Sequence, residues 1–286
     1  ILNPVFQEAT KKKLGINSDY ANYANCLVNT TAEACHVTQG LLKRENVLVA
    51  IYNPVKNTRD QLIRIKVPTT KVQVYLMKSR SEKVKLDTDV ICFNQTSASD
   101  CDLFFLDRFE GFSMNHYLLV PAQKSNLVAG VEAIDLRAPV KTVQLPGNRS
   151  VTVSFLAKLR LFSLIDRQDL TTVVYNDGLE SHPFRFRVNY YPAYCTSSGQ
   201  NSGAYIFRPK NKERDHSVPY AVMNSAKIFK GKVVTQVTFY SDEAIVVMRF
   251  ENRQSSTPGF ALDTFVNSIN IQDNIGKEIV ILVDAL

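Results

Sequence analysis

The sequence predicts a mainly β protein with a short N-terminal helical segment, then a small β-sandwich and part of a larger β-supersandwich. From Glu45 onward, apolar residues recur with a period of two or in short continuous runs, as β-strands require. These runs recur about every ten residues and are separated by Asn-Pro, Lys-Ser and Pro-Gly turn signals, which is typical of a β-sandwich. Before Glu45 the apolar residues follow helical spacing instead.

The first 42 residues contain the helical segment. In residues 4–30, Val5, Ala9, Leu14 and Tyr20 recur at spacings near three, four and seven, with an interruption over residues 15–18. Two short helices are expected here. We interpret residues 1–42 as the end of a helical bundle that carries a disulfide loop.

Residues 43–150 are expected to form the small sandwich and residues 151–286 the first, truncated part of the large one. In the second block, residues 182–194 alternate most clearly between apolar and polar side chains, and residues 232–252 read as a hairpin that closes at Ser241 and Asp242. The last strand, "EIVILVDAL", would be an unpaired edge or would lack a neighbour. The strands of the first block are expected in "NVLVAIYNP", "QLIRIKVP", "KVQVYLM", "DVICFN", "DLFFL", "HYLLVPA", "VEAIDLRAP", "KTVQLP" and "RSVTVSF".

Composition places the chain among folded globular proteins. Of its 286 residues, 45% are hydrophobic and 21% charged, and the formal net charge is +7. Lys and Arg are scattered, and we interpret the clusters at 11–13 and 208–214 as solvated faces rather than a nucleic-acid site. No apolar run approaches the roughly 20 residues that span a bilayer. The segment that begins at Ile1 does not resemble a signal peptide, so we expect a piece of a longer protein.

The five cysteines favour an oxidising compartment, although five reduced cysteines in a cytosolic fold remain an alternative. Cys26 with Cys35, and Cys92 with Cys101, could each close a loop of about ten residues. Cys195 is left over. Glycosylation sequons occur at Asn29, Asn94 and Asn148, and the first two fall inside the expected disulfide loops, which would hold them in solvent.

Complete catalytic motifs are absent from the sequence. The four histidines lie far apart, and the chain contains no H-x-D, H-E-x-x-H or C-x-x-C pattern. The phosphate-binding glycine patterns and the G-x-S-x-G elbow are also missing. A carboxylate pair for glycoside cleavage is defined by its separation, which a sequence does not show. We therefore assign neither a catalytic residue nor a metal ligand to this chain.

Four segments carry a family resemblance: "NCLVNTTAEAC", "AIYNPVKNTRDQLIRIKVP", "NSGAYIFRP" and "IGKEIVILVDAL". They resemble class II α-mannosidases of glycoside hydrolase family 38, in the order in which that family has them. "AIYNPVKNTRDQLIRIKVP" (50–68) resembles the start of the family's first β-domain, and "NCLVNTTAEAC" (25–35) the small glycosylated disulfide loop just before it. "NSGAYIFRP" (201–209) is similar to the family's S-G-A-Y-x-F stretch, with an ending closer to the lysosomal branch. "IGKEIVILVDAL" (275–286) matches a later G-K-E segment.

This resemblance implies part of a retaining lysosomal-type α-mannosidase, which removes terminal α-D-mannose from N-glycans in the lysosome or after secretion. The zinc cofactor and the catalytic residues would belong to an N-terminal α/β domain, and this segment would brace that domain and by itself be inactive. The expected partners are that domain and mannose-containing glycans, with homodimerisation left open. By motif match, Ser202, Gly203 and Tyr205 would contribute to the sugar pocket.

Two alternatives stay open. Period-two alternation places Gly203, Tyr205 and Phe207 on one strand face, so Tyr205 could instead be a core residue with Ser202 and Gly203 in a turn. The whole chain could also be a stand-alone secreted β-sandwich module that binds carbohydrate or protein without catalysis.

Overall fold

The computed structural model confirms a mainly β fold built from antiparallel sheets. Its described residues form two compact units, and each is treated by itself. The first comprises Ile1–Gly130, Phe229–Thr235 and Phe250–Gly259, and the second Val131–Ile228, Gln236–Arg249 and Phe260–Leu286. The three-part division at residues 42 and 150 stays a prediction. The structure describes residues 10–14, 36–92, 101–128, 131–135, 140–145, 148–155, 171–176, 178, 180–192, 218–221, 223–252, 260–266 and 277–285.

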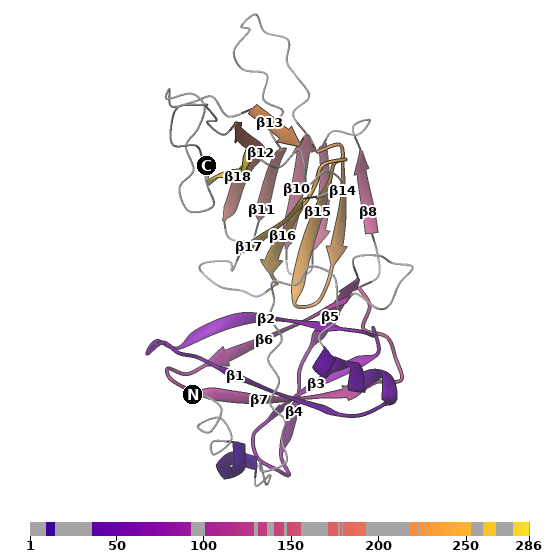
Figure 1. Cartoon of the computed structure of the whole chain (residues 1–286), viewed down its shortest axis with the longest axis vertical. Helices are drawn as coiled ribbons and strands as arrows, with labels where there is room; N and C mark the ends of the chain where they lie inside the picture. The colour runs from indigo at the N-terminus through magenta and orange to yellow at the C-terminus, as the bar shows by residue number, and fades with distance from the viewer. Residues whose placement is uncertain are drawn as a thin grey trace, which may run out of the picture. The chain divides into compact units, whose positions relative to one another are not determined.

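The first unit contains two antiparallel sheets (Figure 1). The four-stranded sheet has the order β1-β7-β3-β4, and the three-stranded sheet has the order β2-β6-β5. Every pairing within them is antiparallel. The strands are β1 (Val47–Tyr52), β2 (Arg59–Val67), β3 (Val72–Met77), β4 (Lys83–Lys85), β5 (Thr88–Cys92), β6 (Cys101–Phe109) and β7 (Met114–Pro121).

One apolar cluster joins these two sheets into a sandwich. Val74 and Leu119 from the four-stranded sheet belong to the same buried cluster as Leu103 and Phe105 from the three-stranded sheet. The ring of Phe105 packs 4.8 Å from that of Tyr117, centroid to centroid. Because successive side chains of a strand point to opposite faces, the period-two pattern of the sequence fills this core from both sides.

Two helical elements belong to the first unit. Residues 10–14 are helical, inside the region where helices were predicted, and Leu14 is only 1% exposed. The rest of that region lies outside the described residues. The 3-10 helix η2 (His36–Lys43) was not predicted; Thr38 donates a hydrogen bond to the Lys66 carbonyl at 2.9 Å, which ties it to β2.

The second unit has a six-stranded sheet and most of a five-stranded sheet, in which three strands have their last or first residues in the first unit. In the six-stranded sheet the order is β13-β12-β11-β10-β9, with β18 paired antiparallel to β12; in the five-stranded sheet it is β17-β16-β15-β14-β8. The strands of the six-stranded sheet are β9 (Val140–Leu145), β10 (Arg149–Phe155), β11 (Thr171–Asn176), β12 (Ser181–Pro192), β13 (Val218–Ala221) and β18 (Lys277–Ala285). Those of the five-stranded sheet are β8 (Val131–Asp135), β14 (Ser225–Lys230), β15 (Val234–Tyr240), β16 (Ala244–Glu251) and β17 (Phe260–Val266).

Phe186 on β12 and Phe239 on β15 bring the two sheets of the second unit together, with ring centroids 4.9 Å apart. Both side chains are buried, as a sandwich core requires. The predicted hairpin is also present, because Ser241 donates its backbone N–H to the Ala244 carbonyl at 2.9 Å between β15 and β16. The C-terminal strand β18 has a neighbour, since its residues pair with β12 from Phe184 to Pro192.

Candidate functional site

The predicted sugar contacts Ser202, Gly203 and Tyr205 lie outside the described residues. The same holds for Cys26, Cys35, Asn29, Asn94 and Cys195. Asn148 is described: it is an exposed turn residue between β9 and β10 with a φ of 59°, a conformation that Asn tolerates better than most residues. Glycosylation of these asparagines stays a prediction.

A disulfide joins Cys92 at the end of β5 to Cys101 at the start of β6. The two residues face each other in the antiparallel register, and both are buried. This bond closes the short connection between two neighbouring strands of the three-stranded sheet. It therefore fixes one edge of the first sandwich.

The Tyr-Asn-Pro segment, which carried part of the family resemblance, holds two loops together. Asn53 is 1% exposed, and its side-chain amide donates to the carbonyls of Asn57 at 3.1 Å and Glu110 at 2.9 Å. Its backbone N–H donates to the Ser113 carbonyl at 2.9 Å. The role of Asn53 is therefore to join the β1–β2 loop to the β6–β7 turn.

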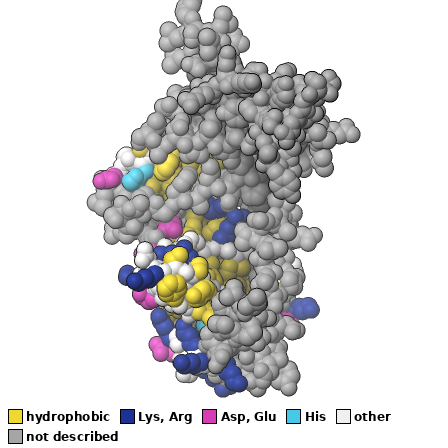
Figure 2. Space-filling view, turned by 60° about the vertical axis from the view of Figure 1, so that its left-hand side comes forward, with side chains coloured by type: hydrophobic (Ala, Val, Ile, Leu, Met, Phe, Trp, Pro, Cys, Tyr) yellow, Lys and Arg dark blue, Asp and Glu magenta, His cyan; other side chains and the backbone are white. Residues whose placement is uncertain are grey.

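These two loops present apolar side chains to solvent. Tyr52, Val55 and Phe112 are 38%, 43% and 61% exposed, and we call them the Phe112 patch. The Phe112 N–H donates to the Val55 carbonyl at 3.0 Å, and Phe112 has a φ of 51°, unusual for an aromatic residue. A Cβ on the preceding Gly111 would collide with the Lys56 carbonyl, so only glycine fits there. Figure 2 shows apolar side chains at the surface with charged side chains around them.

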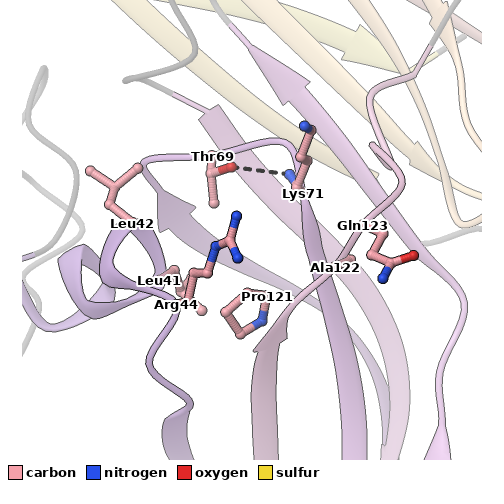
Figure 3. Close-up of a pocket in the computed structure, with 8 residues that line it drawn as sticks. All are labelled: Leu41, Leu42, Arg44, Thr69, Lys71, Pro121, Ala122 and Gln123. Atoms are coloured by element: carbon pink, nitrogen blue, oxygen red, sulfur yellow. Dashed lines mark hydrogen bonds between the residues drawn. The ribbon is translucent and has the colours of Figure 1, made fainter.

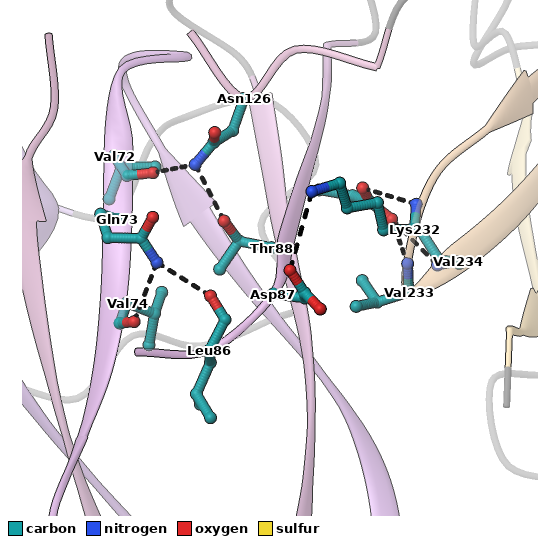
Figure 4. A network of polar contacts seen from close by, with 11 residues as sticks. Val72, Gln73, Val74, Leu86, Asp87, Thr88, Asn126, Lys232, Val233 and Val234 are labelled. Carbon is teal, nitrogen blue, oxygen red and sulfur yellow. Dashed lines mark hydrogen bonds and ion pairs between the residues drawn. The ribbon is translucent and has the colours of Figure 1, made fainter. Parts of the chain in front are cut away.

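A second polar cluster surrounds Asp89 on β5. Its carboxylate accepts backbone N–H groups from Lys232 at 2.9 Å, Val233 at 2.7 Å and Val234 at 3.0 Å, all in the first unit. Figure 4 labels the donor residues Lys232, Val233 and Val234, and it also shows the bonds from Asn126 to the Val72 carbonyl and the Thr88 hydroxyl. The cluster fixes the β14–β15 turn on the end of the three-stranded sheet. The Asp89 carboxylate is therefore engaged by the backbone of the protein itself.

The third cluster lies where the helical residues 10–14 meet β7. The Thr10 hydroxyl and His116 Nε2 lie 2.8 Å apart, and Lys13 donates to the Met114 carbonyl at 3.3 Å. Burial, and then the positive charge of Lys13, lower the pKa of His116 to about 4. Nearby, the Tyr117 hydroxyl donates to Asp107 at 2.6 Å, and burial raises the pKa of that hydroxyl. A neutral His116 therefore belongs to the folded state.

A groove of about 500 Å³ opens beside the end of η2, and we call it the Arg44 groove (Figure 3). Buried Leu41 and the half-buried Pro121 and Ala122 contribute its apolar surface. Two cations, Arg44 and Lys71, line it together with Thr69 and Gln123. The complete lining is Leu41, Leu42, Arg44, Thr69, Lys71, Pro121, Ala122 and Gln123. No carboxylate is among these residues, so the groove lacks the acids of glycoside cleavage.

The carboxylates buried in the described part of the first unit are engaged by the protein. Asp89 accepts three backbone N–H groups, Asp102 pairs with Arg64 at 3.0 Å, and Glu251 accepts the Leu62 N–H at 3.1 Å. Among the described residues, no group of three or more His, Cys, Asp or Glu side chains could hold a metal ion. The zinc implied by the family resemblance stays a prediction for the parent protein, and we derive no zinc chemistry here. No helix within the described ranges is long and apolar enough to cross a membrane.

Comparison with known proteins gives a similarity at low sequence identity. No family model matches the chain. The chain is 26% identical over 264 residues to the lysosomal alpha-mannosidase of Dictyostelium discoideum, an alignment that covers 86% of this chain and 24% of the relative. The chain thus spans about a quarter of the length of the relative. The similarity supports a relationship to the α-mannosidases of glycoside hydrolase family 38.

The sequence did not predict the roles of several residues in these sites. Asn53 lies in a quoted motif, but nothing in the motif indicates that its amide joins two loops. No local pattern indicates Asp89 or His116, because their hydrogen-bond partners lie far along the chain. The role of Arg44 depends on its backbone conformation, which the sequence does not show either.

Proposed function

We propose that this chain is part of a retaining lysosomal-type α-mannosidase that removes terminal α-D-mannose from N-glycans in the lysosome or the secretory pathway. The observation that carries the proposal is the 26% identity to a lysosomal alpha-mannosidase over 264 residues. The order of the four sequence landmarks supports it independently of overall identity. In this proposal the zinc and the nucleophile belong to a catalytic domain outside the chain.

The role of this segment is to brace that catalytic domain. In the first unit, two stacked sheets share one buried apolar cluster, and the buried carboxylates described above are all engaged in structural bonds. The Phe112 patch is an exposed apolar surface on loops held by Asn53, and such surfaces commonly mark contacts between protein parts. The same patch favours the second candidate function, a stand-alone module that binds a protein or carbohydrate.

Activity measurements separate the two functions. The full-length parent protein should hydrolyse an α-mannoside and lose activity when zinc is chelated, whereas the purified 286-residue chain should not turn it over. Robust turnover by this chain alone would contradict the proposal. A parent protein without mannosidase activity would favour the binding module.

Within this function, we propose that Tyr205 bonds a mannose hydroxyl, beside Ser202 and Gly203. Replacing Tyr205 by Phe in the full-length enzyme removes one hydroxyl and should lower kcat/KM for a mannoside by about tenfold, the worth of a hydrogen bond to substrate. Tyr75→Phe is a matched control, because that ring packs under Lys83 in the first sandwich, with Nζ 4.7 Å from its centroid. Unchanged kinetics in Tyr205→Phe would assign this residue to the core instead.

A further inference from the structure

The Arg44 groove combines two cations, Arg44 and Lys71, with an apolar floor. Within the described part of the chain, neither the Arg44 guanidinium nor the Lys71 ammonium has a hydrogen-bond or ion-pair partner. Figure 3 shows the guanidinium extending across the groove toward Thr69, with Pro121 beside it. The groove, at about 500 Å³, falls in the range of small-molecule sites, which is roughly 300 to 1,000 Å³.

The backbone at Arg44 is held in a conformation that favours glycine. Its φ is 60°, and it follows the last residue of η2, where the Arg44 N–H donates to the Leu41 carbonyl at 3.2 Å. The next N–H, of Glu45, donates to the Gly40 carbonyl at 2.9 Å. Helices commonly end on a glycine at this point because glycine adopts positive φ without a steric penalty. The chain instead has an arginine there, and its side chain lines the groove.

The opposite wall is fixed by the ends of β3 and β7. Lys71 accepts the Ala122 N–H through its carbonyl at 2.9 Å and donates its own N–H to the Thr69 hydroxyl oxygen at 3.1 Å. Val72 and Pro121 are partners in the β3–β7 register. The backbone that carries Lys71, Pro121 and Ala122 is therefore rigid, and the two cations start from fixed points on either side of the groove.

We propose that the Arg44 groove binds the phosphate or carboxylate group of an anionic sugar. A guanidinium presents two parallel N–H donors that match a carboxylate or phosphate, and Lys71 adds a second positive charge. The Gln123 amide and the Thr69 hydroxyl can bond sugar hydroxyls, while Leu41, Pro121 and Ala122 pack against ring carbons. This site is independent of the proposed mannosidase function, because it needs neither zinc nor an acid.

Binding to the 286-residue chain tests the proposal. Titrations at low salt with glucose 6-phosphate, with glucuronate and with uncharged methyl glucoside compare phosphate, carboxylate and no charge. We expect at least one anionic sugar to bind and the uncharged sugar not to. Arg44→Gln should weaken binding by about tenfold or more and Lys71→Gln by a smaller factor, as expected for losing charged hydrogen bonds. Lys85→Gln is the control, since Lys85 is an exposed lysine on β4 that does not line the groove.

Arg44→Gly separates binding from folding. Glycine relieves the positive φ, so the thermal unfolding midpoint should stay the same or rise, while binding of the anionic sugar is lost. Selective binding of the phosphate or of the carboxylate supports the site and assigns its ligand. Equal binding of the uncharged sugar, binding of neither anion, or unchanged affinity in Arg44→Gly would overturn the proposal.

Discussion

At the scale of single residues, Asp89 shows how a buried carboxylate is stabilised by backbone donors. Its side chain is buried, with 4% exposure, and accepts three backbone N–H groups from residues 232–234. A Cβ on Gly231 would collide with the same carboxylate, so this turn position requires glycine. Buried ionised groups are tolerated when their hydrogen bonds are satisfied in this way.

Replacing Asp89 by Asn should therefore destabilise the first unit. The amide keeps one oxygen but turns an NH₂ group toward backbone donors, which leaves at least one buried N–H without an acceptor. We expect a loss of about 2 to 3 kcal/mol in the free energy of unfolding, measured by urea denaturation. Asp87→Asn is the matched control, because Asp87 is exposed and its ion pair with Lys232, at 3.7 Å, should be worth less than about 1 kcal/mol. Equal effects of the two substitutions would contradict this account.

The sequence could not predict these residue contacts. Asp89 and Val233 are 144 residues apart, and the Thr10 to His116 contact spans 106 residues. A single sequence contains no signal for contacts of such separation, so only the residue types were visible. The disulfide partners Cys92 and Cys101 were visible because their separation is short and both flank predicted strands.

At the scale of elements, the strand pattern was predictable wherever burial imposes a period. On β12 the apolar Phe186 and Val188 are buried as the alternation predicts, whereas the polar Asn189 beside them is also buried. Strand β5 is buried at all five of its residues, and its apolar Val90, Ile91 and Cys92 fit this burial. Strand β4 was missed because all of its residues, Lys83–Lys85, are exposed and carry no apolar pattern. The 3-10 helix η2 was missed because it is only eight residues long and contains Gly40, a poor helix former.

The contact of the helical residues 10–14 with β7 depends on a neutral His116. The pKa of its ring is lowered from 6.5 to about 4 by burial first and by the charge of Lys13 second. Between these two values the unfolded chain binds a proton that the folded chain does not. Stability from this group is therefore fully present above pH 6.5 and is lost as the pH falls toward 4.

We expect this group to contribute of order 3 kcal/mol to the loss of stability between pH 6.5 and 4. His116→Gln removes the titration and keeps an acceptor for the Thr10 hydroxyl, so its unfolding free energy should depend less on pH in this window. Thr10→Val should lower stability by about 1 to 3 kcal/mol at every pH and leave the slope in place. Urea denaturation at a series of pH values measures both. A slope that is the same in His116→Gln and in the unsubstituted chain would show that another group controls the acid response.

At the scale of the whole molecule, the first unit is not continuous in sequence. It takes Phe229–Thr235 and Phe250–Gly259 from beyond residue 130. These inserted segments supply the three donors to Asp89 and the Glu251 carboxylate that accepts the Leu62 N–H at 3.1 Å. Composition and periodicity reveal only shifts along the chain, so the sequence gives no indication that these two distant segments belong to the first unit.

A fragment of residues 1–130 should therefore be much less stable than the same residues within the whole chain. In the fragment the Asp89 carboxylate lacks its donors, so Asp89→Asn should be neutral or stabilising there, although it costs about 2 to 3 kcal/mol in the whole chain. The four proteins are the whole chain and the fragment, each with and without Asp89→Asn. Their unfolding free energies, from urea denaturation followed by circular dichroism, form a cycle, and its coupling energy measures the contribution of residues 232–234. Asp87→Asn in both backgrounds serves as the control. If Asp89→Asn cost the same in the fragment as in the whole chain, the stability of the first sandwich would not depend on its inserted segments.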